Sequence, residues 1–157
     1  MTMIPINVVV EEDDFDVQQQ QNWLTAVGPH VGAVVSFVGL VRDINNNQGV
    51  SAMTLEHYPG MTEQTITAIC QQAAERWTLH SISVIHRVGD LLPSDQIVYV
   101  GVSSRHRGMA FEACEFIMDF LKTDAPFWKK EQTSDGASWV DARESDRSAS
   151  ERWASDK

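Results

Sequence analysis

The sequence predicts an α+β fold, a mostly antiparallel sheet with helices on one face. Two segments, residues 61–77 and 107–123, carry apolar side chains at the i, i+3, i+4, i+7 spacing of a half-buried helix. Several other segments are rich in β-branched residues or alternate between apolar and polar ones, as strands do. From residue 32 onward the order is β-β-α-β-β-α followed by a hairpin, which is typical of an α+β sandwich.

The N-terminal part holds one strand pattern and a polar stretch. Residues 4–10 alternate loosely, which suits an edge strand. An acidic run at residues 11–16 and a glutamine tract at residues 18–21 follow. We interpret this stretch as a solvated loop that leads into a short helix around residues 23–27, in preference to a binding segment.

The middle of the chain is predicted to form two strands and a helix. Residues 32–42 are β-rich, residues 43–49 have the composition of a polar turn, and residues 50–58 alternate again. Pro59-Gly60 ends that strand, and the first long helix begins next. Its predicted buried face consists of Ile66, Ile69, Cys70, Ala73 and Trp77.

Two more strands, the second long helix and a hairpin follow. Residues 81–89 and 96–104 are rich in isoleucine and valine, which suits strands covered by helices. The helix over residues 107–123 ends before Pro126. Its predicted buried stripe is Ala110, Ala113, Cys114, Ile117 and Leu121. The hairpin pairs residues 127–132 with 138–141 around Asp135-Gly136, and residues 142–157 form a polar tail.

Length and charge limit the kind of protein and ligand. A chain of 157 residues with 43% hydrophobic residues suits one domain spanning residues 1–157. The net charge of −10 argues against non-specific binding to nucleic acid or to an anionic membrane. A basic pocket within such an acidic body favours a small anionic ligand, and a groove for a partner's acidic patch is the alternative.

No metal site or secretory signal is expected. The sequence contains no CxxC, no HExxH and no cluster of His and Cys. Cys70 and Cys114 fall in apolar helical patterns and are expected to be buried free thiols, with a disulfide as the alternative. His57 and His86 lie in strand patterns and are interpreted as hydrogen-bonded structural histidines. The N-terminus lacks the features of a signal peptide, so we expect a cytoplasmic protein.

The positive charges are concentrated in one part of the chain. Five of the 12 Lys and Arg residues lie between positions 105 and 130. Arg105, His106 and Arg107 stand where a strand passes into a helix, and the free N–H groups of a helix start bind phosphate or carboxylate. The alternative is that these are surface cations paired with Glu112 or Glu115.

The lysines of the same region are the next candidates. Lys122 lies beside the buried stripe at the end of its helix, where it either lines a pocket or complements the helix dipole. Lys129 and Lys130 are adjacent in a predicted strand, so one should point inward and the other outward. Arg42 ends an earlier strand, where a charge is usually solvated.

Four stretches of the sequence carry a family resemblance. They are GAVVSFVGLVRD, TLEHYPGMTE, VIHRVGDLLPSDQIVYVGVSSRHRGMAFEACEFIMDFLKTDAPFWKKE and WVDARESD. From about residue 32 to residue 153 the chain resembles the large, catalytic subunit of molybdopterin synthase. Residues 1–31 match no motif of that family and are expected to be variable within it.

The resemblance implies a sulfurtransferase of molybdenum cofactor biosynthesis. The family enzyme adds two sulfurs to cyclic pyranopterin monophosphate and so forms the dithiolene of molybdopterin. The sulfur comes from a thiocarboxylate on the Gly-Gly C-terminus of a small ubiquitin-like carrier subunit. The assembly is a heterotetramer built on a homodimer of large subunits, and the fold is an α/β hammerhead with a small antiparallel subdomain. No cofactor is expected.

The resemblance also implies site residues. Lys122 and Lys129 match the active-site lysines, His106 and Arg107 match an anion-binding pair, and Arg105 matches a variable position. The expected substrate-binding residues are Leu40, Val41, Arg42, His106, Arg107, Lys130, Glu131 and Arg143. Arg143 is expected to reach the pocket from a neighbouring subunit.

From these residues we expect a division of labour. His106, Arg107 and Arg42 bind the substrate phosphate, and the two lysines promote sulfur transfer. A channel for the carrier's C-terminus would be walled by Phe37, Met118, Phe127 and Trp128, although these residues equally suit a core.

Two other classes of function are also considered. A non-enzymatic protein that only holds a phosphorylated ligand would need His106 and Arg107 but not Lys122 and Lys129. RNA binding in a basic groove is disfavoured by the net charge of −10.

Overall fold

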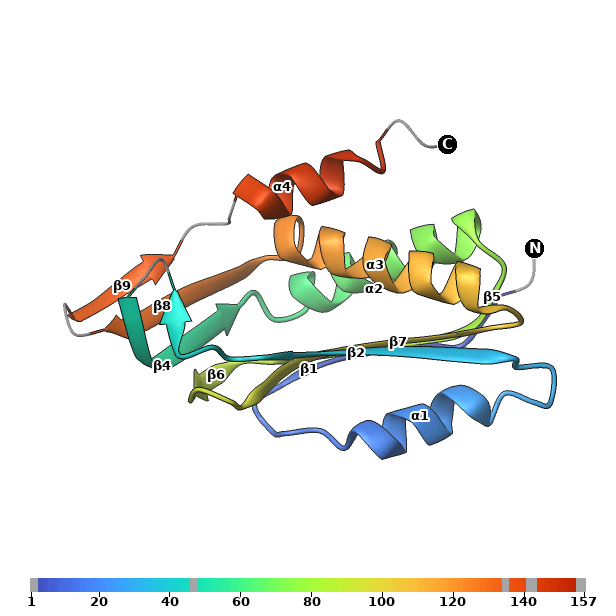
Figure 1. The fold of residues 1–157 in the computed structure, drawn as a ribbon, viewed down its shortest axis with the longest axis horizontal. Coiled ribbons are helices and arrows are strands. Elements are labelled where there is room, and N and C mark those ends of the chain that lie inside the picture. Colours follow the sequence, from blue (N-terminus) through green and yellow to red (C-terminus); the bar gives the residue numbers. More distant parts are fainter. Residues whose placement is uncertain (1–2, 46–47, 134–135, 141–143, 155–157) are drawn as a thin grey trace.

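The computed structural model describes residues 3–45, 48–133, 136–140 and 144–154 (Figure 1). In chain order its elements are β1 (Ile6–Glu11), α1 (Val17–Thr25), β2 (Ala33–Leu40), β3 (Ile44–Asn45), β4 (Gln48–His57), α2 (Met61–Arg76), β5 (Leu79–Arg87), β6 (Gly89–Leu91), β7 (Gln96–Ser104), α3 (Arg107–Thr123), β8 (Phe127–Thr133), β9 (Gly136–Val140) and α4 (Glu144–Glu151). The predicted α+β fold is confirmed, and both long helices begin where the sequence predicts them.

The first sheet has the strand order β1-β5-β7-β2. Strand β1 pairs with β5 in parallel, whereas the β5–β7 and β7–β2 pairs are antiparallel. Helices α2 and α3 cover one face of this sheet, as predicted, and the main core lies between them and the strands (Figure 1). Helix α1 covers the opposite face, so the expectation that all helices lie on one face does not hold for α1. The second cover is needed because β7 is buried on both faces from Val98 to Ser104.

Helix α1 contains the glutamine tract that we predicted to be a solvated loop. Asp16 caps the helix by accepting a hydrogen bond from the backbone N–H of Gln19 at 3.2 Å. The Gln20 side-chain oxygen accepts from the Ser83 hydroxyl at 2.7 Å, and the Gln21 amide donates to Ser36 at 3.2 Å. The glutamines therefore hold α1 on the polar side chains of the sheet, and their role is structural.

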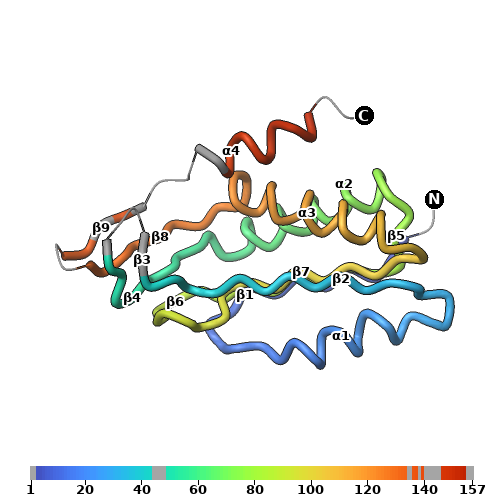
Figure 2. Tube along the Cα trace, viewed as in Figure 1, coloured from blue at the N-terminus to red at the C-terminus, as the bar shows by residue number. Residues whose placement is uncertain are grey.

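The second sheet lies beyond the C-terminal end of α3 (Figure 2). Its strand order is β3-β4-β8-β9, with β6 also paired to β4. The segment predicted as a polar turn thus contributes the short strand β3. The chain passes from β5 of the first sheet to β6 of the second at Gly89, which has a φ of +85°. This positive φ is a conformation that residues other than glycine rarely adopt, so glycine is favoured where the two sheets meet.

Both cysteines are buried and unpaired, as predicted. Burial raises the pKa of the Cys70 thiol and of the Cys114 thiol to about 12, which leaves both unreactive. No helix in the described part of the chain is long and apolar enough to cross a bilayer.

Helix α4 forms within the segment that we predicted to be a polar tail. It runs back along α3 in the opposite direction (Figure 1). Trp153, just after α4, is buried edge-on against Trp77 and Phe116. Its indole N–H donates to the Asp119 carboxylate at 2.7 Å, and Arg76 donates to its backbone oxygen at 3.2 Å. The sequence signal for this docking was Trp153 itself, the only large apolar residue after position 142.

We expect Trp153→Ala to lower the free energy of unfolding by about 3–5 kcal/mol, because a buried indole and its hydrogen bond to Asp119 are lost. The measurement is chemical denaturation followed by circular dichroism. The matched control is Trp139→Ala, since Trp139 is 57% exposed, and its cost should stay below about 1 kcal/mol. Equal losses in the two variants would contradict the docking of α4.

Candidate active site

Lys122 and Lys129 meet where α3 passes into β8. Lys122 lies in the last turn of α3, and Lys129 is the third residue of β8. The chain turns sharply between them, with the backbone N–H of Phe127 donating to the oxygen of Ala125 at 2.9 Å. The two ammonium groups are close enough that the charge of Lys122 depresses the pKa of Lys129.

Lys129 lies in a partly buried, crowded electrostatic environment. Burial lowers its pKa most, the charges of Lys122 and Arg42 lower it further, and the carboxylates of Glu131 and Asp146 oppose this shift. A lysine with a depressed pKa gives up its proton more readily than a solvated one. This environment suits proton transfer and the stabilisation of negative charge.

Strand β8 separates its two adjacent lysines, as predicted. Lys129 and Glu131 lie on the inward side, where Glu131 is buried. Lys130 is exposed, and its ammonium lies 5.8 Å from the centre of the Trp139 ring on β9. Lys130 therefore lies on the other face of the strand from Lys129.

The segment after β2 brings Arg42 to the same place. Val41 is buried against Met53 and Leu91, and its backbone N–H donates to the oxygen of Asp95 at 2.9 Å. This anchor makes Val41 a core residue and leaves Leu40 and Arg42 exposed on either side of it. The backbone position of Arg42 is thus fixed by packing, while its guanidinium is within electrostatic reach of Lys129.

His86 lies beside the lysines, which the sequence did not predict. Its ring stacks on Phe127, with 4.0 Å between ring centres, and its Nδ1 lies 2.8 Å from the backbone oxygen of Arg87. Burial lowers the pKa of His86 to about 4, and the charges of Lys122, Lys129 and His57 contribute. The neutral ring therefore donates from Nδ1, which confirms a satisfied histidine. Nothing in the periodicity of β5 indicates its cationic neighbours.

His106 and Arg107 lie at the other end of α3. His106 is the residue before the helix, and Arg107 is its first residue. At 1.5 Å per residue, the helix places Arg107 about 22 Å from Lys122. Arg42 is also distant from His106, because β2 starts opposite Ser104 and ends opposite Gln96. A single chain therefore does not bring Arg42 next to His106 and Arg107, the three residues that we expected to bind one phosphate.

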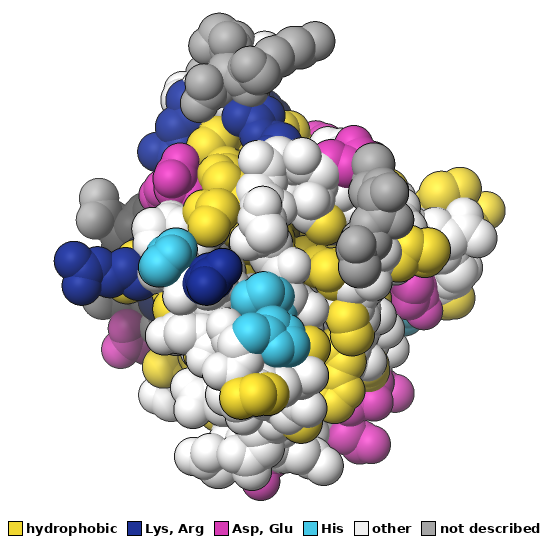
Figure 3. Space-filling view, turned by 90° about the vertical axis from the view of Figure 1, so that its right-hand side faces the viewer, with side chains coloured by type: hydrophobic (Ala, Val, Ile, Leu, Met, Phe, Trp, Pro, Cys, Tyr) yellow, Lys and Arg dark blue, Asp and Glu magenta, His cyan; other side chains and the backbone are white. Residues whose placement is uncertain are grey.

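The end of the molecule that carries His106 and Arg107 is shown in Figure 3. Histidine side chains gather there with a basic one in the middle of the face. His30 and His80 contact edge to face at 4.4 Å between ring centres. Both Arg105 and Arg107 are exposed, and within the described ranges neither pairs with Glu112 or Glu115. Glu115 pairs with Arg152 at 2.9 Å instead, so the predicted alternative of surface ion pairs does not hold.

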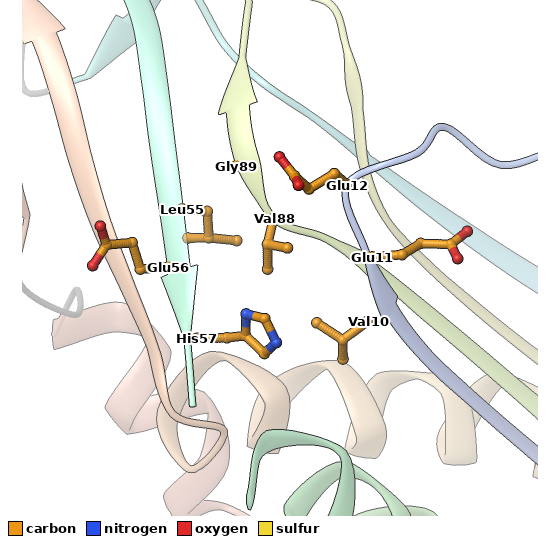
Figure 4. A pocket seen from close by; sticks show the side chains of 8 residues that line it. All are labelled: Val10, Glu11, Glu12, Leu55, Glu56, His57, Val88 and Gly89. Carbon is orange, nitrogen blue, oxygen red and sulfur yellow. The ribbon is translucent and has the colours of Figure 1, made fainter. Parts of the chain in front are cut away.

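A cavity of about 460 Å³ opens at the junction of the two sheets (Figure 4), and part of its lining comes from β4 where that strand pairs with β8 beside Lys129. It is lined by Val10, Glu11, Glu12, Leu55, Glu56, His57, Val88 and Gly89. Figure 4 shows the Glu11 and Glu56 carboxylates pointing away from Val88 at its centre. This lining contains acidic groups and no lysine or arginine, so the cavity does not suit an anion. Arg143, the remaining candidate, lies outside the described residues.

Comparison with known proteins identifies the family of this chain. A family model described as "MoaE protein" matches residues 10–124. The chain belongs to the MoaE family. This MoaE chain is 57% identical to the molybdopterin synthase catalytic subunit of Vibrio cholerae, over 93% of the chain and 97% of that protein. It is 52% identical to the Escherichia coli subunit, over 96% and 100% respectively.

Solved structures agree with the family. The MoaE protein of Burkholderia ambifaria superposes on this MoaE chain with a TM-score of 0.81 at 51% identity, covering 97% of the chain and 99% of that protein. Molybdopterin synthase from Staphylococcus aureus gives 0.78 at 30% identity, covering 89% and 99%. The predicted family, and with it an enzyme of molybdopterin synthesis, are confirmed. The site residues implied by the resemblance remain predictions.

We expect His86 to make stability depend on pH. Its pKa is about 4 in the folded protein and 6.5 in the unfolded chain, so the unfolded chain alone takes up the proton between these values. The contribution of neutral His86 to the free energy of unfolding is therefore fully present above pH 6.5. It is lost, by at most about 3 kcal/mol, as the pH drops towards 4.

The measurement is the free energy of unfolding of wild type and His86→Phe between pH 7.5 and 4.5. Phenylalanine keeps the ring stacked on Phe127 but does not titrate, so the difference between the two proteins should shrink or reverse at low pH. His106→Gln, at an exposed position, serves as the control and should parallel wild type. Parallel curves for wild type and His86→Phe would rule out the role of His86.

Proposed function

We propose that this MoaE chain transfers sulfur from the thiocarboxylated C-terminus of a small ubiquitin-like carrier subunit to cyclic pyranopterin monophosphate, forming the dithiolene of molybdopterin. The observation that carries the proposal is the pair formed by Lys122 and Lys129 at the junction of α3 and β8. The names of the relatives, which are molybdopterin synthase catalytic subunits, support the same reaction.

The lysine pair suits the charge changes of this reaction. In each transfer the carrier's sulfur forms a C–S bond to a side-chain carbon of the pterin, and a C–O bond of that carbon breaks, with the oxygen leaving with the phosphate group or as water. Water then cleaves the acyl C–S bond, which leaves the sulfur on the pterin and releases the carrier's C-terminus as a carboxylate. Negative charge develops on the acyl oxygen while water attacks, and fixed ammonium groups stabilise it. The depressed pKa of Lys129 also makes its proton easier to donate than that of a solvated lysine. The two roles are assigned to the pair as a unit.

The non-enzymatic alternative is less well supported. A protein that merely holds a phosphorylated ligand has no use for a partly buried lysine beside a second lysine, because burying these charges costs stability. In sulfur transfer, by contrast, the two lysines would stabilise the negative charge that develops on the acyl oxygen. The reaction as proposed uses no metal or organic cofactor, and two buried, unreactive thiols suit the reducing cytoplasm that we expect for the protein.

We expect Lys122→Ala to reduce turnover by about 10²–10³-fold, because one preorganised cation at the reacting oxygen is lost. The assay mixes the variant with thiocarboxylated carrier and cyclic pyranopterin monophosphate and quantifies the dithiolene product. Arg105→Ala is the control, since Arg105 is an exposed cation at a position expected to vary within the family, and it should retain activity within about threefold. If the Lys122 variant keeps turnover within a few-fold at unchanged thermal stability, the chemical role is refuted.

The phosphate site is proposed to form between two copies of the chain. Lys122, Lys129 and Arg42 would come from one copy, and His106 with Arg107 from the other. The support is the 22 Å length of α3 between the two groups, which makes the site incomplete in one chain. A two-fold interface joins opposite ends of the two α3 helices and so builds two identical sites. Arg143 of a neighbouring copy is assigned to the same phosphate.

Mixing inactive variants tests this shared site. Lys122→Ala and Arg107→Ala homodimers should each be inactive, the second through weakened binding of the pyranopterin phosphate. After subunit exchange, half of the dimers are mixed and each of these holds one intact site, so about a quarter of wild-type activity should return. The control mixes Lys122→Ala with Lys129→Ala, which damage the same half and should restore nothing. No recovery in the first mixture would place both groups within one subunit.

The carrier subunit is proposed to dock near Phe37 and Trp128. These are exposed by 41% and 48%, whereas Met118 and Phe127 pack against the main core. Of the four residues predicted to wall a channel, two therefore remain available. A protein of the same fold from Helicobacter pylori, 19% identical with a TM-score of 0.68, was solved as a complex of subunits 1 and 2 of molybdopterin-converting factor. The heterotetramer of two large and two small subunits is part of the same proposal.

A further inference from the structure

The docked position of α4 has a consequence for the lysine pair. Arg152, just after α4, donates to the Asp119 carboxylate at 2.7 Å and pairs with Glu115 at 2.9 Å. The Trp153 indole donates to Asp119 as well. The two carboxylates that Arg152 contacts, Glu115 and Asp119, are four residues apart and lie on one face of α3. These contacts therefore fix the position of α4 along α3.

The register determines which residue of α4 lies nearest the site. The two helices run in opposite directions (Figure 1), so moving backwards along α4 from Arg152 leads towards the C-terminal end of α3. Asp146 lies six residues before Arg152, which is about 9 Å of helix. The same 9 Å along α3 from Asp119 passes Lys122 and reaches the turn into β8. The first part of α4 is thus level with the junction that holds the two lysines.

Few carboxylates offset the positive charges at this junction. The groups that act on Lys129 are Lys122 from α3, Arg42 from the end of β2, Glu131 from β8 itself and Asp146 from α4. His86 from β5 faces both lysines but is neutral. Among the described residues, three cations therefore share two carboxylates, and of these two only Asp146 is supplied by an element other than β8. Its side chain is half-buried rather than fully solvated.

We propose that Asp146 is a positioning residue: the docked α4 holds its carboxylate close to the junction of α3 and β8, where its charge helps to keep the Lys129 ammonium protonated for the reaction. This role rests on the proposed function of the lysine pair. The two carboxylates act on the half-buried ammonium through their charge, Glu131 from the strand of Lys129 itself and Asp146 from α4, and both oppose the lowering of its pKa by burial and by the neighbouring cations. The contacts of Arg152 and Trp153 with Asp119 then keep Asp146 in place, so α4 becomes part of the active site.

The test measures the protonation of Lys129 directly. Lysines react with acetic anhydride only when neutral, so acetylation followed by mass spectrometry over a range of pH gives the midpoint for each lysine. Removing the Asp146 charge in Asp146→Asn should move the Lys129 midpoint to lower pH by at least about 0.5 unit, or about threefold higher reactivity at fixed pH. Asp146→Glu should restore most of the shift. Lys130, exposed on the other face of β8, is the internal reference.

Two further variants make the result specific. Glu151→Gln removes the same charge from an exposed position on the same helix and should leave the Lys129 midpoint unchanged. Trp153→Ala undocks α4 without touching Asp146 and should shift the midpoint in the same direction as Asp146→Asn. An unchanged midpoint in Asp146→Asn, or an equal shift in Glu151→Gln, would overturn the proposal.

The sulfur-transfer assay adds a separate arm. Asp146→Asn should lower kcat and move its pH profile to lower pH, with little change in KM for the pyranopterin. Normal turnover and an unmoved profile would overturn the positioning role even if the labelling midpoint shifts. If wild type makes no dithiolene with the carrier, the proposed function fails, and the labelling midpoint still decides whether Asp146 faces Lys129.

Discussion

The length of α3 is the constraint on which the site depends. This helix is packed on the first sheet along one side and against α4 on another, with Ala110, Phe116 and Ile117 buried in the core. It therefore acts as a rigid rod with one group of cations at each end. Neither end can approach the other without breaking the core, so any ligand that needs both groups must be bound by two copies of the chain. In the proposed shared site, the geometry of this one element would link assembly to catalysis.

The second sheet contributes residues to the site at the C-terminal end of α3, where the two lysines lie. Strand β8 leaves α3 after a three-residue turn and brings Lys129 back beside Lys122. The passage at Gly89 and the anchor of Val41 at the same junction fix the other approaching segments. Four segments far apart in the sequence therefore converge on one place: the end of β2, the end of β5, the α3–β8 turn and the start of α4.

The sequence predicts the elements whose stability is local and misses those that depend on distant contacts. Both long helices and strands β7 and β8 start where their patterns indicate, because their apolar periodicity is strong. Helix α1 begins at Val17, earlier than the short helix predicted around residues 23–27, because its glutamines bind hydroxyl groups of the sheet, which no periodicity reveals. Helix α4 was missed because it is mostly polar and is held by Trp153 and Arg152. The neighbours of His86 depend on how the two sheets meet, and no local pattern records that.

The separation of the two groups of cations follows from residue numbers alone, because they flank a helix whose rise per residue is known. The distance between Arg42 and the pair His106 and Arg107 does not, because it depends on how β2 pairs with β7. Burying Lys129 among other cations also opposes folding. Its pKa is lower in the folded protein than in the unfolded chain, so the unfolded chain holds the proton more tightly, and this opposition to folding fades only as the pH rises towards 10.5. The carboxylates of Glu131 and Asp146 reduce that cost. A body with 22 acidic residues supplies such partners readily, and a site of scarce positive charges within it is selective for an anion.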